Sequence, residues 1–213
     1  MTTIAIFGGT GYAGGAIASE AASRGHRVIA VARGAADRAN AGIEYRAGDI
    51  HDAAFVDALA SEADVLVVAL PHREIDGRKL GDALPSLLDA SRAHATRLGF
   101  VGGAGSSLVA PGGPRLIDGP DFNDEWKPEA QAAVDLLEAL RASDGADWFV
   151  MSPPALFGSY APGERLGRYR LGGDVLVTTD DGQSFISGED YAIAFVDEIE
   201  QAAHRNERVT VGY

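Results

Sequence analysis

The chain has 213 residues, 46% of them hydrophobic, which is long enough to bury one substantial core. Its 31 acidic and 18 basic side chains give a formal charge of -13, which disfavours binding to nucleic-acid phosphates and to anionic lipid surfaces. The sequence contains no cysteine, which excludes disulfides, thiolate catalysis and cysteine-ligated metals. An anionic ligand therefore has to be held by a local group of backbone amides or by a few arginines placed beside it.

The N-terminal residues lack the basic and long apolar segments of a secretory leader. No later stretch reaches the roughly 18 uninterrupted apolar residues of a membrane-spanning helix. We therefore expect a cytoplasmic protein that contacts no membrane and no nucleic acid. The five histidines show no ligand spacing, so we expect no metal site and assign them surface or helix-end positions.

The first third of the chain alternates short apolar runs with stretches of helical composition. The runs predict strands at residues 4–7, 26–32, 43–47 and 64–70, and the stretches between them predict helices at 12–23 and 52–61. Because most of the runs are apolar at nearly every position, they are typical of parallel strands covered on both faces.

The same alternation continues to residue 151. It predicts a mostly helical segment at 75–95 with an interruption at Pro85, strands at 97–101 and 147–151, and a helix at 128–142. Between residue 102 and about Lys127 lies a loop rich in Gly, Pro and Asp, and a loop of that length usually carries function. The alternation predicts a doubly wound parallel α/β sheet, with ligands beyond the carboxyl ends of its strands.

The C-terminal tail departs from this pattern. Residues 175–179 and 184–187 flank a turn at 180–183 and predict a hairpin, after which Ser187 and Asp190 can cap a helix to about residue 203, followed by a strand at 208–211. We expect one Rossmann-type domain over residues 1–213, in which residues from about 155 to 190 form a small lobe over the site.

A glycine-rich turn follows the first predicted strand. Gly8, Gly11 and Gly14 fit the spacing G-x-x-G-x-x-G, and Gly9, Gly11 and Gly14 fit G-x-G-x-x-G. The missing side chains allow a tight turn, and the amides of the helix that follows face a dinucleotide pyrophosphate. The alternative is a glycine turn that serves packing alone, but its place between a strand and a helix favours the dinucleotide.

The end of the second predicted strand indicates which dinucleotide is preferred. An acid there would accept hydrogen bonds from the ribose 2′-hydroxyl, but this chain has Arg33 instead. Arg33 can pair with a 2′-phosphate, which favours NADP(H) over NAD(H), or it is an exposed loop arginine. Asp49 can meet the adenine amino group, cap the helix at His51, or do both.

The glycine turn, residues 48–50, residues 102–104 and the run at 152–157 together resemble the atypical short-chain dehydrogenases of the NAD(P)H-binding, NmrA-like type. Residues 162–169 and 184–192 are similar to the C-terminal pattern of the bacterial NADH-flavin reductase-like group within that type. The resemblance implies a Rossmann domain with a C-terminal substrate lobe. It also implies an NADPH site made by Gly8, Thr10, Gly11 and Tyr12, with Arg33, Asp49, Ile50, Leu70 and Gly103 along its path.

One motif of the wider dehydrogenase family is missing. Enzymes that oxidise alcohols use a Tyr-x-x-x-Lys pair as their acid and base, but here the corresponding positions fall near Lys127 and Gln131. This disfavours alcohol oxidation and epimerisation.

Ser106 is a weak catalytic candidate. The alternative, which also holds for Ser107 beside it, is an ordinary loop serine. Five aromatic residues form either a stacking wall for a planar ring or ordinary packing: Phe122, Trp126, Phe157, Tyr160 and Tyr169.

These observations leave three hypotheses. The first is an NADPH-dependent oxidoreductase that passes hydride to a flavin, a quinone or a similar planar acceptor, which needs no acid from the protein. The alternative is a non-enzymatic regulatory protein that senses NADP(H). The third is an isomerase or reductase with an acid that the sequence does not reveal.

Overall fold

Within residues 1–34, 40 and 42–213, which the computed structural model describes, eight strands form one sheet in the order β3-β2-β1-β4-β5-β6-β8-β7. All neighbouring strands are parallel except β7 and β8. The strands are β1 (Thr3–Phe7), β2 (Arg27–Ala32), β3 (Ile43–Ala47), β4 (Val65–Val68), β5 (Arg97–Val101), β6 (Trp148–Ser152), β7 (Arg170–Leu171) and β8 (Glu207–Gly212). The predicted doubly wound parallel sheet of the Rossmann type is confirmed.

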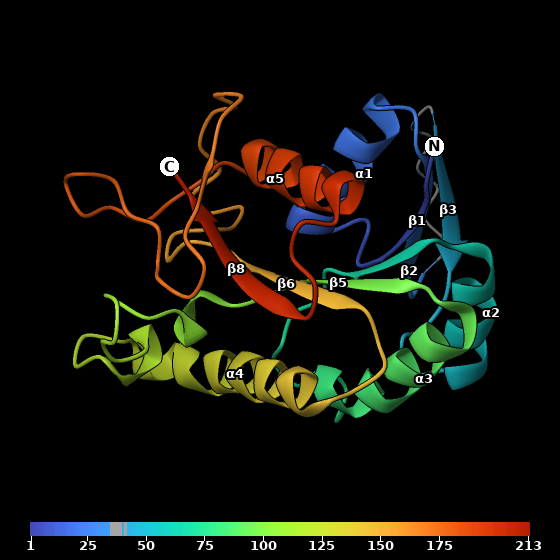
Figure 1. The fold of residues 1–213 in the computed structure, drawn as a ribbon, viewed down its shortest axis with the longest axis horizontal. Helices are drawn as coiled ribbons and strands as arrows, with labels where there is room; N and C mark the ends of the chain where they lie inside the picture. The colour runs from blue at the N-terminus through green and yellow to red at the C-terminus, as the bar shows by residue number, and fades with distance from the viewer. Residues whose placement is uncertain (35–39, 41) are drawn as a thin grey trace.

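Helices cover both faces of this sheet (Figure 1). On one face lie α1 (Tyr12–Ser23) and α5 (Gly188–Gln201), and on the other lie α2 (Ala53–Glu62), α3 (Leu84–His94) and α4 (Lys127–Ala142). Successive side chains of a strand point to opposite faces, so Ile4 and Ile6 pack under α1 and α5, whereas Ala5 and Phe7 join the core under the other three helices. This two-sided burial explains why the strands read as unbroken apolar runs.

Most predicted elements agree with the structure to within three residues at each end, but the segment at 75–95 does not. Residues 75–79 are not helical, because Ile75 and Arg78 exchange backbone hydrogen bonds across a turn in which Asp76 and Gly77 have positive φ. The helix α3 begins at Leu84, so Pro85 lies in its first turn, where a missing amide hydrogen leaves no bond unmade. A 3-10 helix, η1 (Leu80–Ala83), leads directly into α3, so residues 80–94 are helical as predicted and Pro85 lies at the change from 3-10 to α-helix.

The predicted hairpin at 175–187 is also wrong. Its turn closes, with Thr179 N donating to Gln183 O at 2.8 Å, but its two arms do not pair with each other. Val175 instead bridges to Leu108, and Phe185 bridges to Leu156. The strand that pairs with β8 in this region is β7, which the sequence analysis missed. The predicted cap of α5 is confirmed, since Ser187 Oγ accepts from Asp190 N at 3.1 Å.

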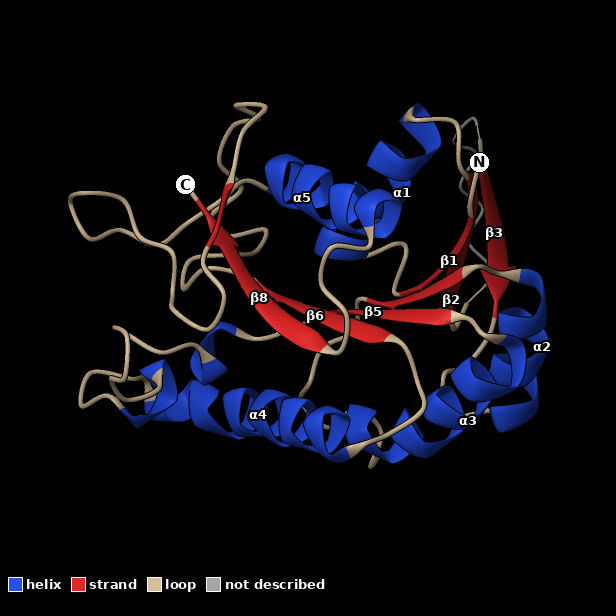
Figure 2. Cartoon of the chain, in the orientation of Figure 1, coloured by secondary structure: helices blue, strands red, loops and turns tan. Residues whose placement is uncertain are grey.

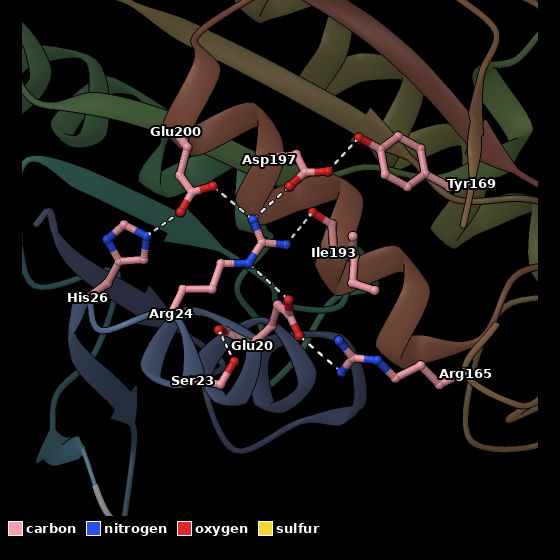
Figure 3. Close-up of polar contacts among 9 residues, drawn as sticks. All are labelled: Glu20, Ser23, Arg24, His26, Arg165, Tyr169, Ile193, Asp197 and Glu200. Carbon is pink, nitrogen blue, oxygen red and sulfur yellow. Dashed lines mark hydrogen bonds and ion pairs between the residues drawn. The ribbon is translucent and has the colours of Figure 1, made fainter. Parts of the chain in front are cut away.

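The predicted lobe region, about residues 155–190, is drawn mostly as loop beside α5 and β8 up to the start of α5 at Gly188 (Figure 2). Two residues of this lobe join a polar network on α1 and α5 that is centred on Arg24 (Figure 3). Arg24 pairs with Glu20 at 2.9 Å and with Asp197 at 2.6 Å, while Arg165 reaches Glu20 at 3.0 Å. Tyr169 donates to Asp197 at 2.7 Å, and burial together with this bond raises the pKa of Tyr169 to about 12. The network ties the lobe to both helices.

Among the described residues, no helix has the length and apolar character needed to cross a membrane.

Candidate functional site

The glycine-rich turn joins β1 to α1 by a very close approach of two backbone segments. Gly8 has a φ of +79°, a conformation that glycine adopts without strain. A Cβ atom at Gly14 would lie 2.3 Å from the carbonyl oxygen of Gly8, so only glycine lets the helix pack this closely on the turn. Gly11 is the N-cap of α1, and no described side chain caps this end of the helix. The first-turn amides of α1 are therefore not occupied by a cap and suit an anionic group.

A cavity of about 330 Å³ opens beside this turn at the carboxyl ends of β1, β2 and β4. We call it the turn cavity. It brings together six of the nine residues that the sequence analysis assigned to a cofactor, namely Gly8, Thr10, Arg33, Asp49, Ile50 and Leu70. Ligands of open parallel sheets bind at this edge, which is why residues from three strand ends converge there.

Residues 71–80 pass over the turn cavity and pair with two of its predicted residues. Arg33, more than half exposed, forms an ion pair with Asp76 at 2.5 Å, and Arg78 forms one with Asp49 at 2.8 Å. Asp49 also accepts from His51 N at 2.9 Å, and the hydrogen bonds from His51 and Arg78 lower the pKa of this carboxyl. Two arginines that line the cavity are therefore paired with carboxylates, of which only Asp49 lines the cavity itself.

Two details of Asp49 and Tyr12 refine the sequence analysis. Asp49 binds the amide of His51, but the N-cap of α2 is Asp52, whose side chain accepts from the amides of Ala54 and Phe55. Tyr12 turns its ring to the lobe, where it packs edge-on to Phe157 at 5.3 Å. Neither Tyr12 nor Gly11, both assigned to the cofactor by the sequence analysis, lines the turn cavity.

A second cavity, of about 860 Å³, meets the turn cavity at Leu70 and Pro71, which line both. We call it the aromatic cavity, because Phe122, Trp126, Phe157 and Tyr160 line it. These are four of the five aromatic residues proposed as a stacking wall, and the fifth, Tyr169, is instead part of the network around Arg24. Gly103, the predicted cofactor residue after β5, lines the aromatic cavity.

His72 lines the aromatic cavity next to Pro71, and the sequence analysis missed it because it assigned the histidines to surface or helix-end positions. Its side chain is buried, and its Nε2 donates to the carbonyl of Val101 at 3.1 Å. Its Nδ1 is buried with no hydrogen-bond partner among the described residues. Burial lowers the pKa of His72, so the ring is neutral at pH 7 and Nδ1 is an acceptor. The position directly after β4 and Pro71 was the available sign that this histidine borders a ligand site.

Ser106 and Ser107 hold the loop after β5 rather than facing either cavity. The hydroxyl of Ser106 donates to the carbonyl of Gly103 at 3.2 Å. The hydroxyl of Ser107 accepts from the buried Arg208 at 3.1 Å. Neither serine lines the turn cavity or the aromatic cavity, so Ser106 is no longer a candidate for contact with a reacting group.

Lys127 and Gln131, near the positions of the missing tyrosine and lysine, do not line the aromatic cavity either. Lys127 pairs with Asp124 at 2.6 Å, and Gln131 donates to Asp135 at 2.7 Å. The part of α4 that lines the aromatic cavity carries Glu129, Ala130 and Ala133. Within the described residues, no lysine lines this cavity, so a tyrosine with a lowered pKa is not built there.

Comparison with known proteins identifies relatives along the whole chain. A family model described as NAD(P)H-binding matches residues 8–202. A solved protein from Burkholderia pseudomallei, provisionally described as exported, is 39% identical with a TM-score of 0.88, and the match covers 100% of both chains. A protein from Bacteroides thetaiotaomicron, provisionally described as an epimerase, is 33% identical with a TM-score of 0.88, covering 100% of this chain and 97% of that one. A protein from Streptococcus pneumoniae, provisionally described as an NADH-flavin reductase, is 32% identical with a TM-score of 0.82, covering 100% and 99%.

Proposed function

The chain belongs to the NAD(P)H-binding family, and on that premise we propose that it is an oxidoreductase that takes electrons from NADPH and reduces a flavin, a quinone or a similar planar acceptor. The observation that carries this proposal is the meeting of the turn cavity and the aromatic cavity at Leu70 and Pro71. One cavity offers helix amides and arginines for a dinucleotide, and the other offers aromatic surface for a planar ring. Their junction is where two such ligands would touch.

The residues of the turn cavity fit the cofactor. Gly14 packs so closely on Gly8 that no side chain fits between them, and this holds the turn beside the amides of α1 proposed to bind the diphosphate. In the proposed arrangement Gly8, Thr10, Gly11 and the backbone of Tyr12 hold the diphosphate, Asp49 and Ile50 border the adenine, and Leu70 and Gly103 lead to the nicotinamide. When bound, NADPH supplies the hydride, so that NADPH, one proton and the oxidised acceptor give NADP+ and the reduced acceptor.

The preference for NADPH over NADH is assigned to Arg33. Its guanidinium lies at the end of β2, where the ribose of the adenosine is bound in this fold. A 2′-phosphate would replace Asp76 as its partner, and a phosphate accepts two parallel hydrogen bonds from arginine. Arg73 and Arg78 also line the turn cavity and add positive charge around the same ligand.

The chain's own contribution to the reaction is position rather than acid catalysis. A flavin or quinone takes its proton from water once it is reduced, so no lysine or tyrosine is needed beside it. The neutral His72 ties the segment after β4 to the end of β5 through the bond from its Nε2 to the carbonyl of Val101, and this fixes the backbone beside the junction. The aromatic side chains exclude water from the ring faces.

The descriptions of the relatives differ among themselves. The Streptococcus pneumoniae protein is described as an NADH-flavin reductase, which supports the proposal. The Bacteroides thetaiotaomicron protein is described as an epimerase, but the usual tyrosine and lysine of that chemistry are missing from the present sequence. We further propose a cytoplasmic location. The Burkholderia pseudomallei relative is provisionally described as exported, so the location needs its own test, which is fractionation of cells.

The test is anaerobic oxidation of NADPH in the presence of a panel of flavins and quinones. We expect turnover far above the rate without protein, and we expect NADPH itself to bind in calorimetry. Tight binding of NADPH with no turnover across the panel would replace the enzyme with the alternative, a sensor of NADP(H). No binding of either nicotinamide nucleotide would end both proposals.

A further inference from the structure

The two cavities carry opposite charges. The turn cavity is lined by three arginines, Arg33, Arg73 and Arg78, against one aspartate, Asp49. The aromatic cavity is lined by three carboxylates, Asp121, Glu125 and Glu129, and by no arginine or lysine among the described residues. A dinucleotide diphosphate therefore meets positive charge, while a ligand of the aromatic cavity meets negative charge.

The carboxylates of the aromatic cavity are only partly compensated. Glu129 accepts from the amide of His72 at 3.2 Å and lies 3.8 Å from Arg73, which itself lines the turn cavity. Asp121 and Glu125 are exposed, and neither forms an ion pair with any described residue. Glu129 also lies in the first turn of α4, where its charge offsets the positive end of the helix dipole.

We propose that the aromatic cavity selects planar acceptors that carry no phosphate or other anionic group. This inference rests on the proposed function and names the substrate class of that same site. A phosphate at the cavity would face Asp121 and Glu125 without a cationic partner, and like charges brought together select against a ligand. An uncharged ring is not repelled by these carboxylates, and it packs against the aromatic side chains of Trp126, Phe157 and Tyr160.

Riboflavin and FMN provide a matched pair of probes, because they share one ring system and differ by a single phosphate. Their dissociation constants can be measured by quenching of flavin fluorescence in the presence of saturating NADP+. We expect riboflavin to bind at least about tenfold more tightly than FMN at low ionic strength, from the repulsion of a phosphate dianion by two nearby carboxylates. The ratio should shrink in high salt, since both carboxylates are exposed to solvent.

A pair of double variants separates local from general charge effects. Asp121→Asn with Glu125→Gln removes two charges at the cavity, and we expect it to bring the dissociation constant of FMN closer to that of riboflavin. Asp180→Asn with Glu207→Gln removes two exposed charges that line neither the turn cavity nor the aromatic cavity, so the net charge changes equally and the ratio of the two dissociation constants should not change.

The outcomes distinguish this inference from the proposed function. The proposed selection against anionic acceptors would be overturned if FMN bound as tightly as riboflavin. It would also be overturned if both double variants changed the ratio of the FMN and riboflavin dissociation constants equally. Binding and anaerobic reduction of 2-methyl-1,4-naphthoquinone, but not of its anionic sulfonate, would support it independently. If NADP+ binds but neither flavin nor either quinone binds or is reduced, the proposed function itself fails, and the inference fails with it.

Discussion

The glycine turn can be tested with two neighbouring glycines of the same helix. Gly14 and Gly15 both lie in the first turn of α1, where alanine is favoured over glycine by about 1 kcal/mol. A Cβ atom at Gly15 would have its nearest non-bonded heavy atom, the carbonyl oxygen of Gly9, at 3.7 Å, an ordinary contact distance. At Gly14 the same atom would lie 2.3 Å from the carbonyl oxygen of Gly8 and 2.8 Å from its carbon. The two substitutions are therefore alike in helix propensity and differ in the clash.

The expected sizes follow from these distances. We expect Gly15→Ala to stabilise the protein by roughly 0.5–1 kcal/mol, which raises the Tm by about 1–4 °C for a chain of this size. In Gly14→Ala the backbone of Gly8 has to move by about 1 Å to reach van der Waals distance, and such overpacking costs about 1–3 kcal/mol, partly offset by the helix gain. Because the displaced backbone borders the proposed diphosphate site, we expect NADPH affinity to fall at least about tenfold, as for other displaced binding groups.

The assay is calorimetric titration of NADPH into both variants, with the Tm and circular dichroism recorded for each. We expect Gly15→Ala to bind as the unaltered protein does and Gly14→Ala to be folded but weak in binding. A folded Gly14→Ala protein with unchanged affinity would refute the assignment of the diphosphate to this turn. An equal loss of NADPH affinity in both variants would refute the role of the clash at Gly14.

Three further predictions concern charged side chains. We expect Arg33→Ala to abolish the larger rise in Tm that NADPH gives over NADH, and Asp76→Asn to enlarge it; equal rises in the unaltered protein would contradict the assignment of Arg33. Glu198→Gln leaves the buried Arg97 without the partner that it now meets at 2.6 Å, and we expect a loss of about 3–5 kcal/mol in denaturant unfolding. Burial raises the pKa of Glu198, but hydrogen bonds from Arg97 and His204 outweigh it and hold the pKa below its ordinary value. The stabilisation from this carboxylate is therefore present above about pH 4.3 and lost as the pH falls through the lower folded value, so the acid limb of the stability curve should be shallower in Glu198→Gln.

The sheet was predictable because β1, β2, β4, β5 and β6 are buried on both faces and leave nearly continuous apolar runs. The bounds of α1, β3 and β5, each of which has a glycine close to at least one end, agree with the structure to the residue. The strand β7 has two residues, too few to show any pattern, and its pairing is set by β8 about 40 residues later. Similarly, the arms of the predicted hairpin pair with Leu108 and Leu156, which no local pattern at 175–187 could indicate.

The turn cavity was predictable for a similar reason, since the carboxyl ends of parallel strands must converge at one edge of the sheet. The direction of the Tyr12 ring was not predictable. It depends on Phe157 and on Pro162, whose carbonyl accepts from the tyrosine hydroxyl 150 positions away in sequence. The aromatic cavity likewise needed the folded chain, because its walls come from the loops after β4, β5 and β6.

The net charge of the chain bears on both the predicted and the missed residues of the turn cavity. A formal charge of -13 requires a local positive patch around any dinucleotide, and the sequence identified only Arg33 as part of it. Of the other two arginines of the turn cavity, Arg73 lies just before residues 75–79, where the predicted helix is absent, and Arg78 lies within them. Positive φ angles at Asp76 and Gly77 turn the backbone there, and this turn sets Arg78 against Asp49 and Asp76 against Arg33. A helix through the same residues would carry its side chains along a different path, so the departure from helical structure is what completes the positive lining of the turn cavity.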